Sequence, residues 1–150
     1  MRALLLGLFL LQASLMAQAL KPVTFDTYLQ GFDYQARKDM KIKSKEMLKL
    51  VAQGKAQLVD IRFREEYEAW HLAGSINIPL NELPSRLNEL DRSKLIITAC
   101  PHNDRANMGR MFLQLKGYNV KYLSDGLLTA IEQLRGDNAK TYIENLNKGK

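Results

Sequence analysis

The sequence is short of the residues that build disulfides and metal sites. Among its 150 residues it has one cysteine, Cys100, and two histidines. One thiol excludes an internal disulfide framework of the kind that stabilises many small exported domains. Cys100 and His102 are the nearest approach to a metal-binding pair, and two ligands without a supporting cluster are too few to indicate a metal. We therefore expect neither a metal nor a cofactor.

Blocks of like charge are also absent. The 22 lysines and arginines and 16 acidic residues give a formal charge of +6, but the basic residues are scattered along the chain. They form no stripe interleaved with aromatic residues, so we expect no nucleic-acid partner. A hydrophobic fraction of 46% and a charged fraction of 25% are ordinary for a folded protein, and the length suits one domain.

Residues 1–19 have the pattern of a secretory signal peptide. Arg2 is followed by an apolar stretch over 3–11, and Ala17-Gln18-Ala19 forms a small-residue cleavage site. An uncleaved membrane anchor is the alternative, but the apolar stretch is interrupted by Gln12 and is short for ~30 Å of hydrocarbon. We expect cleavage after this site, a periplasmic or secreted mature protein, and membrane contact only transiently through the signal peptide. An unpaired thiol in an exported chain is a candidate reactive group.

Residues 20–39 form a lead-in segment. Apolar residues recur there at helical spacing, which predicts an amphipathic helix capped by Thr24 or Asp26 and weakened at Gly31. Because the segment is rich in aromatic residues, we expect it to pack on the domain; a surface for a partner or a homodimer is the alternative. The apolar residues are Phe25, Tyr28, Leu29 and Phe32.

From residue 40 to 150, short apolar strands alternate with helical patterns. This alternation predicts a single α/β domain with a central, mostly parallel sheet and helices on both faces. Ser44 is expected to cap the first helix of the domain. The helix over 104–116 shows helical spacing of Met108, Met111, Phe112 and Leu115. Strands are expected near 40–42, 57–61, 76–78, 95–97 and 120–123, and helices over 44–53, 64–70, 83–90, 104–116, 127–134 and 138–147.

Cys100 lies between the predicted strand 95–97 and the predicted helix 104–116. A thiol at a strand end that faces the amino end of a helix can be activated by the backbone N–H groups and the dipole there. The same geometry holds an anion, and Arg105 provides a forked second contact. The residues from Pro101 to Asp104 favour an exposed loop, although an inert buried cysteine is the alternative. The arrangement indicates a nucleophilic cysteine in an anion-binding loop.

Three motifs resemble the rhodanese domain family, in the family's order and spacing. The first combines Leu58-Val59-Asp60-Ile61-Arg62, Glu65-Glu66-Tyr67 and the run from His71 to Leu80, where the family reads D-V-R, E-[YF] and G-H-I-P-G-A-x-N-I-P. The second, Cys100 to Arg105, is similar to the family's active loop C-x-x-x-x-R. The third, Gly117-Tyr118 with Val120 to Gly126, resembles the closing G-[YF]-x-x-V-x-x-L-x-G-G. The resemblance covers about residues 40–134.

This resemblance implies an enzyme, a cofactor-free rhodanese-type sulfurtransferase. Cys100 would attack the outer sulfur of a donor, carry it as a persulfide and pass it to a thiophilic acceptor. Backbone N–H groups from His102 to Arg105 would hold the persulfide. The expected substrate-binding residues are His102, Asn103, Asp104 and Arg105. The implied partners are small sulfur-containing anions or a protein that carries a thiol or a persulfide.

Several positions depart from the family pattern. Asn103 and Ala106 stand where the family commonly has glycine and serine or threonine; asparagine tolerates left-handed backbone, so the loop is expected to close. Asp104 cancels the charge of Arg105, which predicts a preference for polysulfide or a protein persulfide over thiosulfate. Trp70 and Asp125 each replace a glycine of the family.

Alternatives remain for single residues and for the whole protein. Arg105 could form a salt bridge to Asp104 or Asp60 instead of binding an anion. Asp60 and Arg62 are expected to form a buried ion pair, and His71 to support the fold. A non-catalytic rhodanese-like binding or sensing module is the main alternative function. A cysteine-dependent phosphatase or arsenate reductase is less favoured, because those loops normally place five residues between cysteine and arginine and this loop has four.

Overall fold

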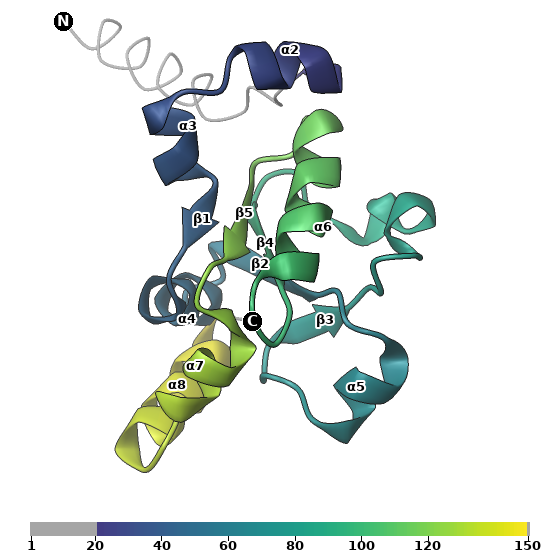
Figure 1. The fold of residues 1–150 in the computed structure, drawn as a ribbon. Helices are drawn as coiled ribbons and strands as arrows, with labels where there is room; N and C mark the ends of the chain where they lie inside the picture. Colours follow the sequence, from purple (N-terminus) through teal and green to yellow (C-terminus); the bar gives the residue numbers. More distant parts are fainter. Residues whose placement is uncertain (1–20, 150) are drawn as a thin grey trace, which may run out of the picture.

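The computed structural model describes residues 21–149, and its centre is a five-stranded sheet (Figure 1). The strands lie in the order β1-β5-β4-β2-β3, and every neighbouring pair is parallel. The α/β class and the parallel sheet are therefore confirmed. The strands are β1 Lys41–Ile42, β2 Ala56–Asp60, β3 Ser75–Asn77, β4 Leu95–Ala99 and β5 Val120–Leu123.

Helices cover both faces of the sheet, as predicted. Helices α4, α7 and α8 lie on one face, and α6 lies on the other together with two short 3-10 turns, η1 and η2. These two turns stand where one helix over 83–90 was predicted. The bounds are α4 Ser44–Ala52, α5 Arg64–Ala69, η1 Leu83–Ser85, η2 Leu87–Glu89, α6 Asp104–Leu115, α7 Gly126–Glu132 and α8 Asp137–Lys148.

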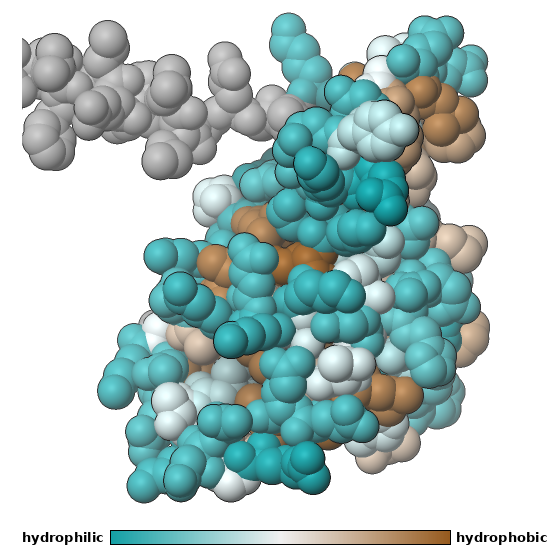
Figure 2. Space-filling view, turned by 60° about the vertical axis from the view of Figure 1, so that its left-hand side comes forward, coloured by the Kyte–Doolittle hydropathy of each residue, from teal (hydrophilic) through white to brown (hydrophobic). Residues whose placement is uncertain are grey.

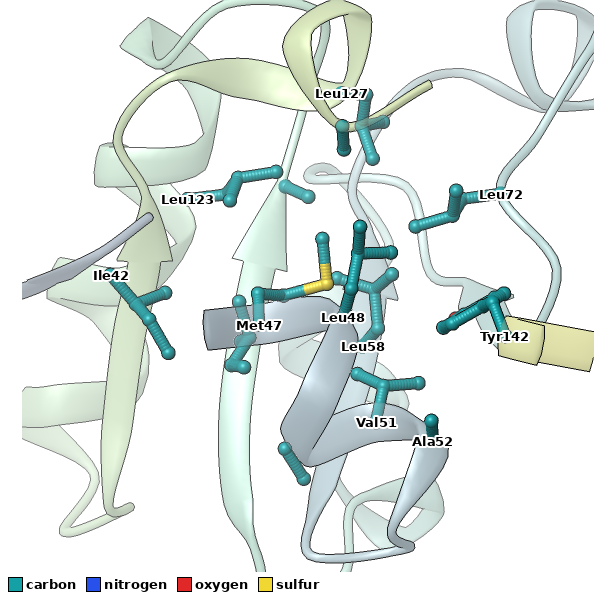
Figure 3. Close-up of a cluster of buried hydrophobic side chains, with 14 residues drawn as sticks. Ile42, Met47, Leu48, Val51, Ala52, Leu58, Leu72, Leu123, Leu127 and Tyr142 are labelled. Atoms are coloured by element: carbon teal, nitrogen blue, oxygen red, sulfur yellow. The ribbon is translucent and has the colours of Figure 1, made fainter. Parts of the chain in front are cut away.

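The α4 face of the sheet is packed with aliphatic side chains (Figure 3). Met47 and Leu48 of α4 belong to one buried cluster with Leu58 of β2, because the apolar residues of α4 lie on one side of the helix. Burial of each such side chain stabilises the fold by roughly 1.5–3 kcal/mol. Tyr142 of α8 closes the cluster, and its hydroxyl donates a hydrogen bond of 2.8 Å to the carbonyl of Ala73. Burial raises the pKa of Tyr142 to about 12.

The buried face of α6 is not the face that carries its largest apolar residues. Ala106, Gly109 and Leu113 are buried, whereas Met108 is 62% exposed. A Cβ atom at Gly109 would lie 3.5 Å from side-chain atoms of Ile61 and of Thr98, so a small residue lets α6 approach the sheet closely. The predicted helical period is correct, but Met108 lies on the exposed side of α6, and the small residues Ala106 and Gly109 are buried together with Leu113.

The amino end of α4 is capped by a residue from a distant part of the chain. The expectation that Ser44 is the cap is wrong, because Ser44 is the first helical residue and the N-cap is Lys43, which makes no side-chain cap. The Asp125 carboxylate accepts hydrogen bonds from the Ser44 backbone N–H and from the Ser44 hydroxyl, both at 3.0 Å. The amide of Gln133 also donates to the Ser44 hydroxyl. These contacts tie α4 to α7 and give Asp125 a role at a position where the family commonly has glycine.

The lead-in segment forms two helices, α2 Phe25–Gln30 and α3 Tyr34–Asp39. The first was predicted, and the Thr24 side chain caps it by accepting a hydrogen bond of 3.2 Å from the Thr27 N–H. The second was not predicted; the Asp33 carboxylate caps it by accepting a hydrogen bond of 2.7 Å from the Ala36 N–H.

Packing of the lead-in segment on the domain is only partial. Tyr28 is half-buried and bonds to Arg110 of α6, but Phe25 and Leu29 are 49% and 50% exposed. Figure 2 accordingly shows apolar surface at the top of the molecule, where α2 lies. The predicted signal peptide lies outside the described residues. Within 21–149, no helix is both long and apolar enough to cross a membrane.

Candidate active site

Cys100 directly follows β4, the central strand, at the carboxyl edge of the sheet. Its carbonyl accepts a hydrogen bond of 3.0 Å from the Leu127 N–H, and the Pro101 carbonyl accepts one of 3.4 Å from the Leu128 N–H. The first turn of α7 therefore fixes the start of the cysteine loop. The other end of the loop is fixed because it continues into α6 at Asp104.

Gly126 is the residue that lets the cysteine loop pack against α7. Its φ is +78°, a left-handed conformation that favours glycine. A Cβ atom there would lie 2.2 Å from the Pro101 carbonyl oxygen and 2.6 Å from that of His102. The close approach of the two backbone segments thus requires glycine at position 126, the second glycine of the closing motif. It does not require glycine at position 125, where this chain has aspartate.

The Cys100 thiol is enclosed, whereas most of the loop that follows it is exposed, as expected from its polar residues. Cys100 is 0% exposed, although His102, Asn103 and Asp104 of the same loop are exposed. Its Sγ accepts a hydrogen bond of 3.4 Å from the Ala106 N–H and, as a thiol, donates one of 3.6 Å to Asp104 Oδ1.

The pKa of the Cys100 thiol lies above its ordinary value. Burial is the main cause, and the negative charge of Asp104 adds to it. The backbone N–H groups of Ala106 and His102 act in the opposite direction, because they stabilise the thiolate. Of the amides expected around the sulfur, that of His102 lowers the thiol pKa. Ala106, whose N–H bonds to Sγ at 3.4 Å, was missed because it lies one residue beyond the predicted set.

Asn103 holds the loop through its side chain. Its Nδ2 donates a hydrogen bond of 3.2 Å to the carbonyl of Ser124. A left-handed conformation was considered for it, but its φ is −154°, and no non-glycine residue among 21–149 has a positive φ. The side chain of His102, in the same loop, is exposed to solvent.

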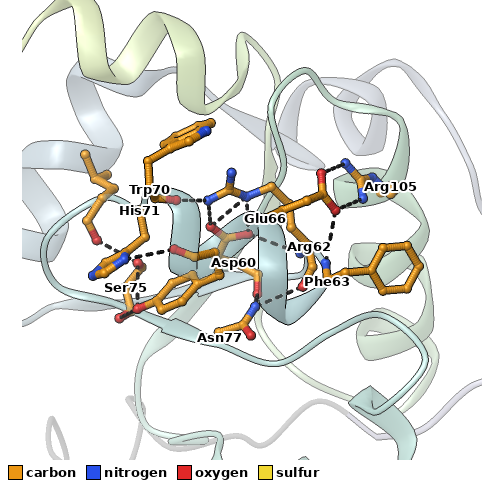
Figure 4. Close-up of polar contacts among 11 residues, drawn as sticks. Asp60, Arg62, Phe63, Glu66, Trp70, His71, Ser75, Asn77 and Arg105 are labelled. Carbon is orange, nitrogen blue, oxygen red and sulfur yellow. Dashed lines mark hydrogen bonds and ion pairs between the residues drawn. The ribbon is translucent and has the colours of Figure 1, made fainter.

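Arg105 is already paired, and with a residue that was not considered for it (Figure 4). Its two terminal nitrogens donate hydrogen bonds of 2.7 and 2.8 Å to the two carboxylate oxygens of Glu66 on α5. This contact holds the pKa of Glu66 below its ordinary value, so the pair is charged at neutral pH. The expected alternatives, a salt bridge to Asp104 or Asp60, are absent among the described residues. The forked guanidinium thus faces a carboxylate of the protein itself.

Asp60 and Arg62 form the buried ion pair that was predicted. The Arg62 side chain is 1% exposed, and its nitrogens contact both Asp60 carboxylate oxygens at 2.7–3.0 Å. Trp70 also contacts Arg62. Its carbonyl accepts a hydrogen bond of 2.7 Å from the guanidinium, and its ring centroid lies 3.9 Å from the guanidinium carbon. Asn77 Nδ2 bonds to both backbone carbonyls of the pair. This network explains Trp70 at a position where the family has glycine.

His71 has a structural environment. Its ring stacks on Tyr67 with centroids 4.2 Å apart, and its Nδ1 lies 3.1 Å from the Tyr67 carbonyl oxygen. Among the described residues, no group of three or more histidine, cysteine, aspartate or glutamate side chains could hold a metal ion. A hollow of about 1030 Å³ between α4 and α8 contains no residue of the cysteine loop.

Comparisons with known proteins identify the class of this fold and loop. A model of the rhodanese-like domain family matches residues 43–130, which is more than half of the chain. The rhodanese-related protein of Thermoplasma volcanium is 27% identical, with a TM-score of 0.56 over 61% of this chain and 90% of that one. The thiosulfate sulfurtransferase of Pseudomonas aeruginosa, 22% identical, has a TM-score of 0.59 over 74% of this chain and 25% of that one, and shows the fold alone. The chain belongs to the rhodanese-like domain family.

A curated relative shows that the domain also occurs in proteins of another kind. The HTH-type transcriptional regulator Rv0324 of Mycobacterium tuberculosis is 39% identical over 85 residues, a match that spans 55% of this chain. The match spans only 38% of the regulator's length. Membership of the family therefore establishes the kind of domain but does not by itself establish its activity.

Proposed function

We propose that this protein is a sulfurtransferase that carries sulfane sulfur as a persulfide on Cys100. The observation that supports this most directly is the position of Cys100: it follows the central strand, and the N–H groups of Ala106 and His102 stabilise its thiolate. An anion at this place is favoured by the amino end of α6. A persulfide would place its outer sulfur in the same electrostatic environment.

The proposed reaction needs no cofactor and no external reductant. The Cys100 thiolate attacks the sulfane sulfur of the donor, an S–S bond to Cys100 forms, and the donor leaves with the electron pair of the broken bond. A thiophilic acceptor then attacks the outer sulfur, and Cys100 leaves as a thiolate. The thiol must lose its proton to solvent before the first step. The Asp104 carboxylate, which accepts the thiol hydrogen bond at 3.6 Å, disfavours the thiolate and opposes this loss.

The charges around the loop favour a donor with little negative charge near the attacked sulfur. Glu66 occupies the guanidinium of Arg105, and Asp104 adds a second carboxylate beside the thiol. A compact dianion such as thiosulfate would meet two carboxylates and one arginine, which together carry one net negative charge. We therefore propose polysulfide or a protein persulfide as the donor, ahead of thiosulfate.

Transfer kinetics test this proposal. The mature protein should transfer sulfur to cyanide with a larger kcat/KM from polysulfide than from thiosulfate, and Cys100→Ala should transfer none. Equal transfer by Cys100→Ala would disprove the role of the thiol. A larger kcat/KM for thiosulfate would disprove the donor preference and leave the nucleophile in place.

A non-catalytic binding or sensing module is the second candidate, and one observation favours it. Cys100 is 0% exposed and its pKa is raised, so at neutral pH the thiol is mostly protonated and shielded. A module of this kind would neither label with sulfur nor transfer it. The same transfer assay therefore separates the two candidates.

Export is a further part of the proposal, supported by the sequence pattern of residues 1–19 alone. The intact mass of the protein recovered from cells should correspond to a chain that begins at Leu20. A protein recovered at full mass in the membrane fraction would instead support the uncleaved anchor.

A further inference from the structure

A second hollow lies at the opposite edge of the sheet from Cys100. It has a volume of about 390 Å³, and its walls come from the lead-in segment, from α6 and from the start of β5. Val120 in its wall pairs with Ile96, which precedes Cys100 by four residues along β4. At the rise of a β-strand, the hollow is therefore roughly 13 Å from the thiol along the sheet.

Arg110 is the unusual residue of this hollow. It is 3% exposed and carries a full positive charge, yet no carboxylate of residues 21–149 forms a salt bridge with it. Its Nη1 donates a hydrogen bond of 2.7 Å to the Tyr28 hydroxyl, and its buried Nε has no described partner. An enclosed charge without a counter-ion is unfavourable, and buried arginines are normally paired.

The other charged groups around the hollow do not neutralise Arg110. The Lys121 ammonium donates a hydrogen bond of 2.6 Å to the backbone carbonyl of Asp39, which carries no charge. The Asp39 carboxylate accepts instead from the amide of Gln35 at 2.9 Å. Gln114 and Asn119 add neutral amide groups to the wall. Within the described part of the chain, Arg110 and Lys121 thus line the hollow with only one carboxylate residue, Asp39, whose carboxylate bonds to Gln35.

We propose that this hollow binds a small oxyanion, the carboxylate or phosphate group of a small molecule, through Arg110. The guanidinium is the forked donor that such groups select, and Tyr28 and Lys121 supply further donors beside it. Because Tyr28 belongs to α2, the bound anion would also hold the lead-in segment against the domain. The site is independent of the sulfur chemistry, since no residue of the cysteine loop contributes to it.

One competing explanation is a single buried water. Asn107 Oδ1, on the same helix and three residues before Arg110, is also buried without a described partner, and a buried water beside either group would satisfy it. A water would satisfy the hydrogen bonds but would leave the charge of Arg110 without a counter-ion. The two explanations therefore differ in their response to added anions.

An NMR titration of the full mature chain distinguishes them, with inorganic phosphate and acetate as separate probes and chloride as the reference salt. We expect saturable shifts of the Ala36, Asn119 and Lys121 amides with phosphate or acetate and none with chloride. Whichever probe saturates at the lower concentration identifies the class of anionic group. Unsaturable shifts, or equal shifts with chloride, would overturn the proposal in favour of the water.

Variants make the assignment to Arg110 specific. Arg110→Met, which keeps the length and removes the charge, should abolish the saturable shifts, whereas Arg37→Met on the exposed face of α3 should preserve them. Cys100→Ser should also preserve them, so a failure of the sulfur chemistry would not affect this test. If Arg110→Met does not fold, Arg110→Lys should bind more weakly than the wild type, and unchanged binding by Arg110→Lys would count against a forked contact.

Discussion

Glu66 and Arg105 face each other through two parallel hydrogen bonds of 2.8 and 2.7 Å, so that a carboxylate of α5 occupies the arginine of the cysteine loop. The pair is partly solvated, with side chains 36% and 29% exposed. It links two motifs that are 39 residues apart in the sequence. Because Glu66 neutralises Arg105, a sulfur donor that approaches the loop meets less positive charge.

Glu66→Gln should free Arg105 for a donor anion. Because a charge-assisted contact to a dianion is stronger than one to a neutral group, we expect kcat/KM for thiosulfate to rise about tenfold. The rate with a protein persulfide should change less. Steady-state kinetics with cyanide as the acceptor measure both.

The matched control is Glu68→Gln, which removes the same charge from an exposed position of the same helix. Equal effects of the two substitutions would show that only the net charge of α5 matters. In that case Arg105 would have no special part in selecting the donor.

Asp104→Asn should make Cys100 more reactive at neutral pH. The Asp104 charge raises the pKa of the thiol, so its removal lowers that pKa and increases the thiolate fraction at every pH below it. We expect alkylation by iodoacetamide at pH 7 to be roughly fivefold faster than in the wild type. A pH profile of the alkylation rate should show its midpoint shifted downward, and an unshifted midpoint would mean that burial alone sets the pKa.

Gly126→Ala should damage both stability and the cysteine loop. The added methyl group would lie 2.2 Å from the Pro101 carbonyl oxygen, in addition to the strain of a positive φ. Gly136→Ala is a matched control, since its φ is +54° and no atom lies within 4 Å of the added Cβ. The control should lose about 1 kcal/mol of unfolding free energy and Gly126→Ala clearly more. Similar losses in urea unfolding would show that the loop can move away at little cost.

Asp125→Ala should loosen the junction of α4 and α7. It removes the acceptor of the Ser44 N–H and hydroxyl, so we expect a loss of about 1 kcal/mol, typical of a removed helix cap. Ser44→Ala removes the hydroxyl's bonds to Asp125 and Gln133 but leaves the backbone N–H at position 44 capped by Asp125, so it should cost less. Chemical denaturation of both variants checks the order, and a larger loss for Ser44→Ala would contradict it.

Local patterns in the sequence were sufficient for most of the fold. The strands over 56–60, 95–99 and 120–123 could be predicted because buried β-branched runs are distinctive in parallel sheets. The cysteine loop could be placed because Cys100 lies between one such strand and a helix. The helix over 34–39 was missed, since none of its residues is buried and its cap is the only clear signal.

Contacts between distant residues could not be predicted, because no local pattern encodes them. Asp125 reaches Ser44 across 81 residues, and Arg105 reaches Glu66 across 39. The burial of Cys100 was also unpredictable, since the polar residues that follow it are exposed while its own side chain points into the core. The sequence showed Glu66 near the start of a predicted helix and Arg105 in an anion-binding loop. It did not show that their charges would neutralise each other.

Intact-protein mass spectrometry after exposure to polysulfide is the most direct test of sulfur transfer through Cys100. We predict a gain of about 32 Da for each sulfur on the wild-type chain, its loss on addition of cyanide, and no gain for Cys100→Ser. Peptide mapping should place the added sulfur on Cys100. A wild-type mass that does not change, or a gain that persists in Cys100→Ser, would contradict the proposal.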